Sequence, residues 1–354
     1  MRAWIDIDLG ALVRNGERLA RHARVPLLPM VKADAYGLGV GPVVRALASL
    51  DLFGFGVATA DEGHELRTLG VTRPVLVFTP ALPLDFGALR EAKLTPCLGD
   101  PAVIHAWAAS GGGAWHLAID TGMHRAGVRW DRMGDVADAA RAHPPEGAFT
   151  HFHSAECDDG SLELQEQRFR DALAALSARP ALLHAENSGA IARRSPSAWN
   201  FARAGVFLYG VGSGATAAIH PEPVAHLRAR IVDIHAILPG DSVSYGATWR
   251  AAAPARIATV AAGYADGYRR SLGNAGTALL HGRRVRVAGT VTMDMTMLDV
   301  TDVPCAVGDV VTLFGRDGDD WLTVQDVARF GHLSPYELLT ELHSRLPRLY
   351  GEPT

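Results

Sequence analysis

The chain has 354 residues, of which 48% are hydrophobic and 20% charged. This composition is typical of folded globular proteins and argues against disorder. Its 34 lysines and arginines against 38 aspartates and glutamates give a formal net charge of −4, which offers no broad basic surface for nucleic acid. No apolar run approaches the ~18 residues that a membrane-spanning helix requires.

The cysteines and the N-terminal segment indicate the cellular compartment. Cys97, Cys157 and Cys305 are widely spaced and form no CxxC pair, so they predict neither a disulfide framework nor a zinc site. The first residues, MRAWIDIDLGAL, alternate carboxylates with apolar side chains, unlike a secretory signal peptide. We therefore expect a cytoplasmic protein without a metal site.

Residues 25–210 repeat one unit, in which a short apolar run is followed by a loop and a helical pattern. The eight apolar runs are Pro26–Val31, Leu52–Ala58, Pro74–Phe78, Leu94–Leu98, Ala114–Ile119, Gly147–Phe152, Ala181–Ala185 and Trp199–Arg203. Eight strand–helix units predict an N-terminal (β/α)8 TIM barrel. A doubly wound open sheet is the alternative, but such sheets usually carry a glycine-rich phosphate loop after the first strand. This chain has Lys32 there.

The pattern changes after about residue 225. Short alternating runs separated by glycine-containing turns predict strands at His226–Leu238, Arg256–Ala262, Ala278–His281, Arg284–Thr292 and Asp309–Phe314. Two helices are expected to begin at the capping sequences of Thr323 and Ser334. The sequence thus predicts two domains, a barrel over residues 1–224 and a C-terminal mostly β domain over residues 225–354.

Polar residues follow the apolar runs of the predicted barrel. They lie at or just after the ends of the runs: Lys32 at the first, Asp120 and Arg125 at the fifth, His151 and His153 at the sixth, Asn187 and Ser188 at the seventh, and Arg203 and Gly205 at the eighth. The active sites of such barrels lie at the carboxyl ends of the strands, so these residues are expected to share one mouth. Lys32 ends an apolar run, where desolvation would lower its pKa and favour the neutral amine used in Schiff-base chemistry. A lysine that reaches from a strand end to solvent is the structural alternative.

Several segments carry a resemblance to a known family. They include VKADAYGLG around Lys32, DTGMHRAGV (120–128), THFHSAE (150–156), HAENSGA (184–190), NFARAGVFLYG (200–210), SYGATW (244–249), GYADGYRR (263–270), TVTMDMTM (290–297) and LPRLY (346–350). In this order they resemble the alanine racemases, barrel enzymes that use pyridoxal 5'-phosphate. The resemblance implies interconversion of L- and D-alanine, which supplies D-alanine for peptidoglycan.

The resemblance also implies roles for individual residues. Lys32 would hold the cofactor as a Schiff base and act as the base on one face of the substrate, and Tyr245 of the partner subunit would be the base on the other face. A hydrogen-bonded chain from Tyr245 through His151 to Arg203 would lower the tyrosine pKa. Arg203 would face the pyridine nitrogen and keep it unprotonated, which favours racemisation over decarboxylation.

The remaining implied roles concern binding. The cofactor set is Lys32, Tyr36, Arg125, His151, Asn187, Ser188, Arg203, Gly205, Val206 and Tyr209, and the substrate set is Arg125, Met293 and Tyr264. Within the cofactor set, the phosphate would contact Tyr36, Ser188 and the amides of Gly205 and Val206. Because Tyr245 and Met293 are expected to act in the partner's site, the resemblance implies a homodimer with composite sites.

The chain departs from the family pattern at three positions. Ala118 replaces a lysine that braces the arginine corresponding to Arg125, Ser344 replaces a tyrosine that reaches the phosphate, and Thr290 replaces an arginine. These departures leave other functions open. A racemase of another small amino acid such as serine is one alternative, and a non-catalytic carrier of the cofactor is another, although carriers are single barrels. A cofactor-free Schiff-base aldolase would not need the phosphate-binding residues.

Overall fold

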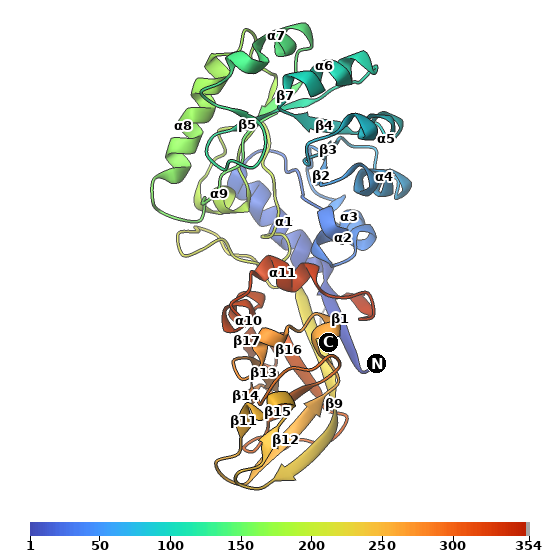
Figure 1. Cartoon of the computed structure of the whole chain (residues 1–354), viewed down its shortest axis with the longest axis vertical. Coiled ribbons are helices and arrows are strands. Elements are labelled where there is room, and N and C mark those ends of the chain that lie inside the picture. The colour runs from blue at the N-terminus through green and yellow to red at the C-terminus, as the bar shows by residue number, and fades with distance from the viewer. Residues whose placement is uncertain (352–354) are drawn as a thin grey trace.

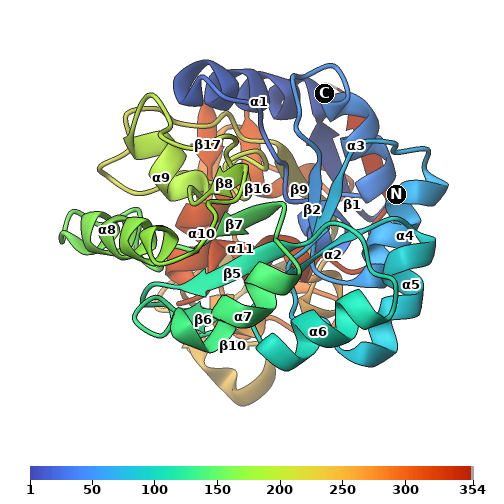
Figure 2. The same ribbon diagram turned by 90° about the horizontal axis from the view of Figure 1, so that it is seen from above.

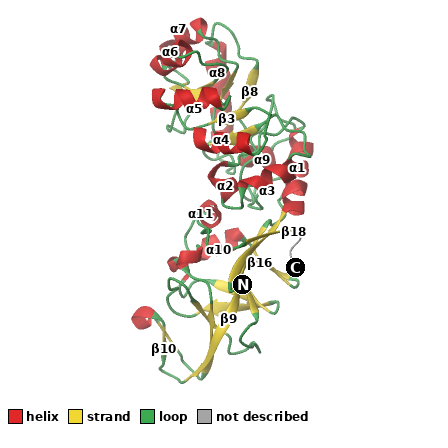
Figure 3. Ribbon diagram, turned by 90° about the vertical axis from the view of Figure 1, so that its right-hand side faces the viewer, coloured by secondary structure: helices red, strands yellow, loops and turns green. Residues whose placement is uncertain are grey.

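The computed structural model describes residues 1–351 and has two parts stacked end to end (Figure 1). One is a curled parallel sheet covered by helices, and the other is a large, mostly antiparallel sheet, as Figure 3 shows by the separation of helices and strands. The predicted fold class, an N-terminal barrel followed by a mostly β domain, is confirmed.

The barrel strands lie in the order β2 (Phe55–Val57), β3 (Val75–Val77), β4 (Thr95–Leu98), β5 (His116–Asp120), β7 (Gly147–Phe149) and β8 (Leu182–His184), and β6 (Val128–Arg129) pairs with β5. The first and eighth predicted runs close the circle without forming regular strands. Leu27 bridges both Leu52 and Ala202, and the Leu28 amide donates to the Ala202 carbonyl at 2.8 Å. Prolines at positions 26 and 29 lack the N–H groups that a regular ladder needs, which explains the irregular first run.

Helices surround these strands, as the view from above shows (Figure 2). They are α1 (Leu9–Ala23), α2 (Lys32–Tyr36), α3 (Val40–Leu47), α4 (Ala60–Thr68), α5 (Phe86–Glu91), α6 (Pro101–Ala109), α7 (Gly134–Ala142), α8 (Ser161–Ala174) and α9 (Ser188–Arg193). Side-chain caps set several of their starts. Asp100, for example, accepts the Val103 amide at 3.0 Å, with Pro101 as the first residue of α6.

The second sheet has the order β17-β16-β13-β14-β15-β12-β9-β1-β18. Its strands are β1 (Ala3–Asp8), β9 (Ala225–Ile237), β12 (Ala255–Val260), β13 (Thr277–Leu280), β14 (Arg283–Val287), β15 (Thr296–Asp299), β16 (Val310–Asp317), β17 (Asp320–Leu322) and β18 (Arg348–Gly351). The hairpin of β10 (Ser242–Val243) and β11 (Trp249–Arg250) lies apart from it. Both expected helix starts are present, each with a capping box, at α10 (Val324–Phe330) and α11 (Pro335–Thr340).

Two features of this sheet differ from the pattern expected of the sequence. The expected strand Arg284–Thr292 ends at Val287, because the backbone turns at Gly289, where φ is +78°. The N-terminal strand β1 lies in the second sheet, between β9 and β18, and Arg228 Nε donates to Asp6 Oδ2 at 2.6 Å across this junction. We propose that the domains divide between residues 224 and 225, with β1 as an extension of the barrel segment into the second sheet. Among residues 1–351, no helix has the length and apolar character needed to cross a membrane.

Candidate active site

A cavity of about 550 Å³ opens at the carboxyl ends of the barrel strands. Lys32, Asp120, Arg125 and His151 line it, so residues that follow the first, fifth and sixth apolar runs share one mouth. Burial lowers the pKa of Lys32, the nearby Arg125 lowers it further, and Glu62 partly opposes them. The shift favours the neutral amine, which is the nucleophilic form of lysine.

The segment after Lys32 has an unusual backbone. Ala33, Asp34 and Ala35 all have φ values of +53° to +54°, and Tyr36 has +57°. The carboxylate of Glu62 holds this left-handed turn, since Oε1 accepts the Ala33 amide at 2.7 Å. Its Oε2 accepts the Ala58 amide at 2.6 Å. Glu62 therefore joins the end of β2 to the lysine turn, a role that was not predicted although the TADE capping box marks this glutamate.

The turn places Tyr36 against Tyr209, and neither is among the described residues that line the Lys32 cavity. The Tyr36 ring stacks on that of Tyr209, with centroids 4.6 Å apart, and Tyr209 donates its hydroxyl to the Met30 carbonyl at 2.8 Å. Burial raises the pKa of both hydroxyls, which keeps them as neutral hydrogen-bond donors. Tyr209 thus positions Tyr36 and fixes the backbone just before Lys32.

The predicted phosphate residues lie together. Ser188 Oγ accepts the Gly205 amide at 2.9 Å and the Phe207 amide at 3.4 Å. A Cβ at Gly205 would lie 3.1 Å from Tyr36 Oη and 3.6 Å from Ser188 Oγ. A Cβ at this position would therefore narrow the space between Tyr36 and Ser188, which we call the cradle. Asn187 caps α9 and donates to the Phe152 carbonyl at 3.1 Å, and Val206 is buried beside the cradle.

Arg203 is 3% exposed and binds the ends of two strands, β7 and β8. Its Nη2 donates to the Thr150 and Ala185 carbonyls at 2.8 and 2.9 Å and lies 3.3 Å from His151 Nδ1. Burial lowers the pKa of Arg203 to about 10, so it remains charged at neutral pH. Burial and the Arg203 charge lower the pKa of His151 to about 3, so this imidazole is neutral.

Two histidines that were not predicted as site residues continue this network. Arg203 Nη1 lies 2.9 Å from His184 Nδ1, and His184 Nε2 lies 2.8 Å from His116 Nδ1. A guanidinium only donates, so His184 accepts at Nδ1 and donates from Nε2 to His116. Burial lowers the pKa of both rings. Their signal in the sequence was a histidine inside each of two apolar strands.

Arg125 is exposed and faces the cavity beside Ala118. Ala118 packs in a small cluster with Cys97 and Phe149. The bracing expected of a lysine at this position is therefore absent from the described residues that line the cavity. Ser344, the second departure, is exposed in the segment between α11 and β18.

Tyr245, Met293 and Tyr264 belong to the second part of the chain and do not line the Lys32 cavity within the described residues. Tyr245 is 70% exposed and Met293 53% exposed. Thr290, the third departure, has a local role, since its Oγ1 donates to the Tyr245 carbonyl at 3.0 Å. A single copy of the chain thus places Lys32, Arg125 and His151 in one cavity and leaves these three residues outside it.

Known proteins match this chain over almost its whole length. Residues 7–213 match the model of the alanine racemase N-terminal domain, and residues 224–350 match that of the C-terminal domain. An alanine racemase of Deinococcus radiodurans is 39% identical, covering 99% of each chain. The solved alanine racemase of E. faecalis is 30% identical, with a TM-score of 0.92 and coverage of 99% and 98%. That of Bartonella henselae, solved with covalently bound pyridoxal phosphate, is 25% identical, with a TM-score of 0.91 and coverage of 99% of each chain.

Proposed function

Because this chain belongs to the alanine racemase family, we propose that it interconverts L- and D-alanine with pyridoxal 5'-phosphate and two bases, Lys32 and Tyr245 of the partner subunit. The observation that carries the proposal is the partly buried Lys32 of lowered pKa in a cavity that also contains Arg125 and His151. The reaction would supply D-alanine for peptidoglycan. We assign it to the cytoplasm on the basis of the three free cysteines.

The residues at the mouth fit the cofactor. Tyr36, Ser188, Gly205 and Val206 would hold its phosphate, because the glycine leaves open a cradle that any Cβ would narrow. Lys32 would bind its aldehyde carbon covalently, and Arg125 would hydrogen-bond its phenolic oxygen. The cofactor supplies an electron sink that makes the α-proton of the amino acid acidic.

The chain's own residues would move the proton. A neutral Lys32 amine takes or returns it on one face, which requires the lowered pKa. Arg203, charged at neutral pH, presents a permanent donor to the pyridine nitrogen and no site that accepts a proton. His151, neutral and held by Arg203, accepts at Nδ1 and keeps its proton on Nε2. That nitrogen is the one we assign to contact with Tyr245.

A homodimer would complete the site. Tyr245, Met293 and Met295 are large side chains that are each more than 40% exposed, and a second copy that covers them would bring them to its own Lys32. The oligomer would then be a two-fold pair with two composite sites.

The test is complementation between two inactive chains with different affinity tags. We expect Lys32→Ala and Tyr245→Phe homodimers to be inactive in a circular dichroism assay with L-alanine. The purified mixed dimer has one intact site and should regain about half of the wild-type activity. A wild-type protein that racemises serine faster than alanine would replace the proposed substrate. A mixed dimer as inactive as both parents would refute the composite site.

A further inference from the structure

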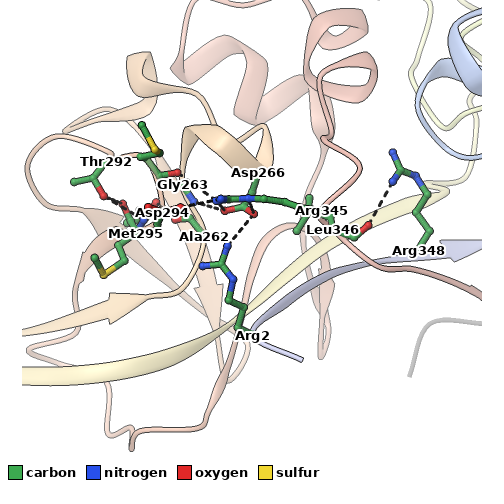
Figure 4. Close-up of polar contacts among 12 residues, drawn as sticks. Arg2, Ala262, Gly263, Asp266, Thr292, Asp294, Met295, Arg345, Leu346 and Arg348 are labelled. Atoms are coloured by element: carbon green, nitrogen blue, oxygen red, sulfur yellow. Dashed lines mark hydrogen bonds and ion pairs between the residues drawn. The ribbon is translucent and has the colours of Figure 1, made fainter.

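A buried carboxylate lies behind the loop that carries Tyr264. Asp266 is 1% exposed and ends the short 3-10 helix Tyr264–Asp266. It accepts the Gly263 amide at 2.9 Å, Arg345 Nε at 2.7 Å and Arg345 Nη2 at 2.8 Å (Figure 4). Arg2 Nη2 lies farther away, at 3.4 Å. The two short contacts from Arg345 are the parallel pair that a planar guanidinium makes with a carboxylate.

The same guanidinium also contacts the loop that carries Met293. Arg345 Nη1 donates to Asp294 Oδ1 at 2.8 Å, and Nη2 lies 3.5 Å from the Met293 carbonyl oxygen. One side chain, from the segment after α11, therefore joins two loops that are far apart in the sequence. Figure 4 shows Arg345 between Asp266 and Asp294, with Arg2 on the other side of Asp266.

The backbones of the Tyr264 loop and the Met293 loop are in direct contact. The Tyr264 amide donates to the Thr292 carbonyl, and the Ala265 amide to the Met293 carbonyl, both at 3.0 Å. A Cβ at Gly263 would lie 2.3 Å from the Thr292 oxygen, so only glycine permits this approach. Thr292 also donates its hydroxyl to the Met295 carbonyl at 2.9 Å, which fixes the turn.

These contacts determine the direction of the Met293 amide. Its own peptide plane is fixed through the Thr292 carbonyl, and the next plane through the Met293 carbonyl. Within residues 1–351 the Met293 N–H has no acceptor, so it remains available to an anion. Two carboxylates belong to these two loops, Asp266 to the Tyr264 loop and Asp294 to the Met293 loop, and Arg345 pairs with both. Without that cation, their charge would oppose the approach of a substrate carboxylate.

We propose that Arg345, held by its ion pair with Asp266, is a positioning residue. It orients the Met293 amide and the Tyr264 ring toward the substrate in the partner's site. This rests on the proposed function, in which those two residues serve the other subunit. Arg345 supplies the geometry of the two loops and the neutralising charge. Its loss weakens substrate binding more than the chemical step, because it touches neither Lys32 nor Tyr245 in the described contacts.

Mixed dimers provide the decisive test. The dimer of a Lys32→Ala chain with a Tyr245→Phe chain has one intact active site. In that site Lys32 comes from the Tyr245→Phe chain, and Tyr245, Met293 and Tyr264 come from the Lys32→Ala chain. We would introduce Arg345→Met into one chain at a time, so that both dimers contain the same three substitutions. We expect the KM for L-alanine to rise about tenfold, with a smaller change in kcat, only when Arg345→Met is on the Lys32→Ala chain.

A second readout is substrate size. If the Tyr264 ring moves, the ratio of kcat/KM for serine to that for alanine should rise in the same dimer and stay unchanged in the other. Equal effects of both placements, on KM and on this ratio, would show a general structural role and overturn the proposal.

Two further variants complete the design. Arg345→Lys keeps the positive charge but cannot make the two parallel hydrogen bonds of a guanidinium. We expect about a threefold rise in KM, again only when the substitution is on the Lys32→Ala chain. If Arg345→Met chains do not form dimers, Arg345→Lys is used in both placements instead.

Arg284→Met is the matched control, because Arg284 forms a similar bidentate pair with Asp320, at 2.9 and 3.0 Å. We expect it to leave KM unchanged on either chain. An inactive parent mixed dimer refutes the composite site itself, whereas an active parent with no placement effect refutes only the role of Arg345.

Discussion

At the residue scale, the turn that follows Lys32 places four consecutive non-glycine residues in the left-handed region. Each such residue costs roughly 1–2 kcal/mol relative to a right-handed conformation. The hydrogen bond from the Ala33 amide to Glu62 offsets part of this cost, as does the stacking of Tyr36 on Tyr209. The strained backbone next to the reactive amine is therefore stabilised by contacts from β2, α4 and the end of the barrel segment.

Glycine at Ala33 tests this strain. Glycine adopts φ near +53° without a steric cost, although it raises the entropy of the unfolded chain. We expect Ala33→Gly to leave the free energy of unfolding within about 0.5 kcal/mol of wild type, measured by urea denaturation. Ala137→Gly, in the middle of the right-handed helix α7, should lower it by about 1 kcal/mol. A comparable loss at both positions would contradict the strained turn.

The phosphate cradle gives a second prediction at this scale. A methyl group at Gly205 would stand 3.1 Å from Tyr36 Oη, in the space we assign to phosphate. Gly205→Ala should weaken pyridoxal phosphate binding about tenfold or more, followed by visible absorbance as the cofactor is added to cofactor-free protein. Gly87→Ala is the control, because nothing lies within 4 Å of a Cβ there. Equal affinities in the two variants would place the phosphate elsewhere.

At the scale of elements, one ion pair fastens β1 to β9 within the second sheet. Arg228 Nε donates to Asp6 Oδ2 at 2.6 Å, and both side chains are about nine-tenths buried. Arg228 Nη1 also reaches Thr312 Oγ1 on β16, at 3.4 Å. The pair thus joins the strand before α1 to two strands of the C-terminal sheet, and so fixes the barrel on that sheet.

Removing the Asp6 charge should lower the stability, since it weakens the short, largely buried contact between Asp6 and the Arg228 guanidinium. We expect Asp6→Asn to lower the free energy of unfolding by about 3 kcal/mol, measured in urea. Asp131→Asn removes a bidentate partner of Arg129 on the surface and should change stability little. If the two variants unfold at the same urea concentration, the pair contributes no more than a surface contact.

At the scale of the whole molecule, three fully buried histidines link stability to pH. Burial lowers the pKa of His116 and of His226 to about 4, and that of His184 well below its usual value. The unfolded chain protonates these rings near pH 6.5, whereas the folded chain keeps them neutral. Their contribution is therefore complete above pH 6.5 and is lost as the pH falls toward 4.

The expected slope is steep. With His151, whose pKa burial lowers to about 3, these rings take up about four protons on unfolding, so the free energy of unfolding falls by about 5 kcal/mol per pH unit between pH 6 and pH 5. Urea titrations at pH 7.5, 6.0 and 5.0 would measure it, and far-ultraviolet circular dichroism would report unfolding. A free energy that does not change between pH 6 and pH 5 would contradict this account.

The sequence predicted much of the architecture because each barrel unit has a local signature, a short apolar run followed by a helical pattern. The rule that active residues follow barrel strands also singled out Lys32, His151, Ser188 and Arg203 from the sequence alone. Glu62 and Arg345 were missed because their roles depend on contacts between distant segments. The position of β1 was missed for the same reason, since Ala3 pairs with Ala229.

The place of β1 has a consequence for synthesis on the ribosome. The strand leaves the exit tunnel long before β9 and β18, its two neighbours in the sheet. Through most of translation its apolar residues therefore lack a partner, and such an open strand invites pairing with a neighbouring nascent chain. Asp6 and Asp8 oppose that pairing as charges within the strand. A stalled chain that ends near residue 224 should lose β1 to protease, and a chain that extends through β18 should keep it.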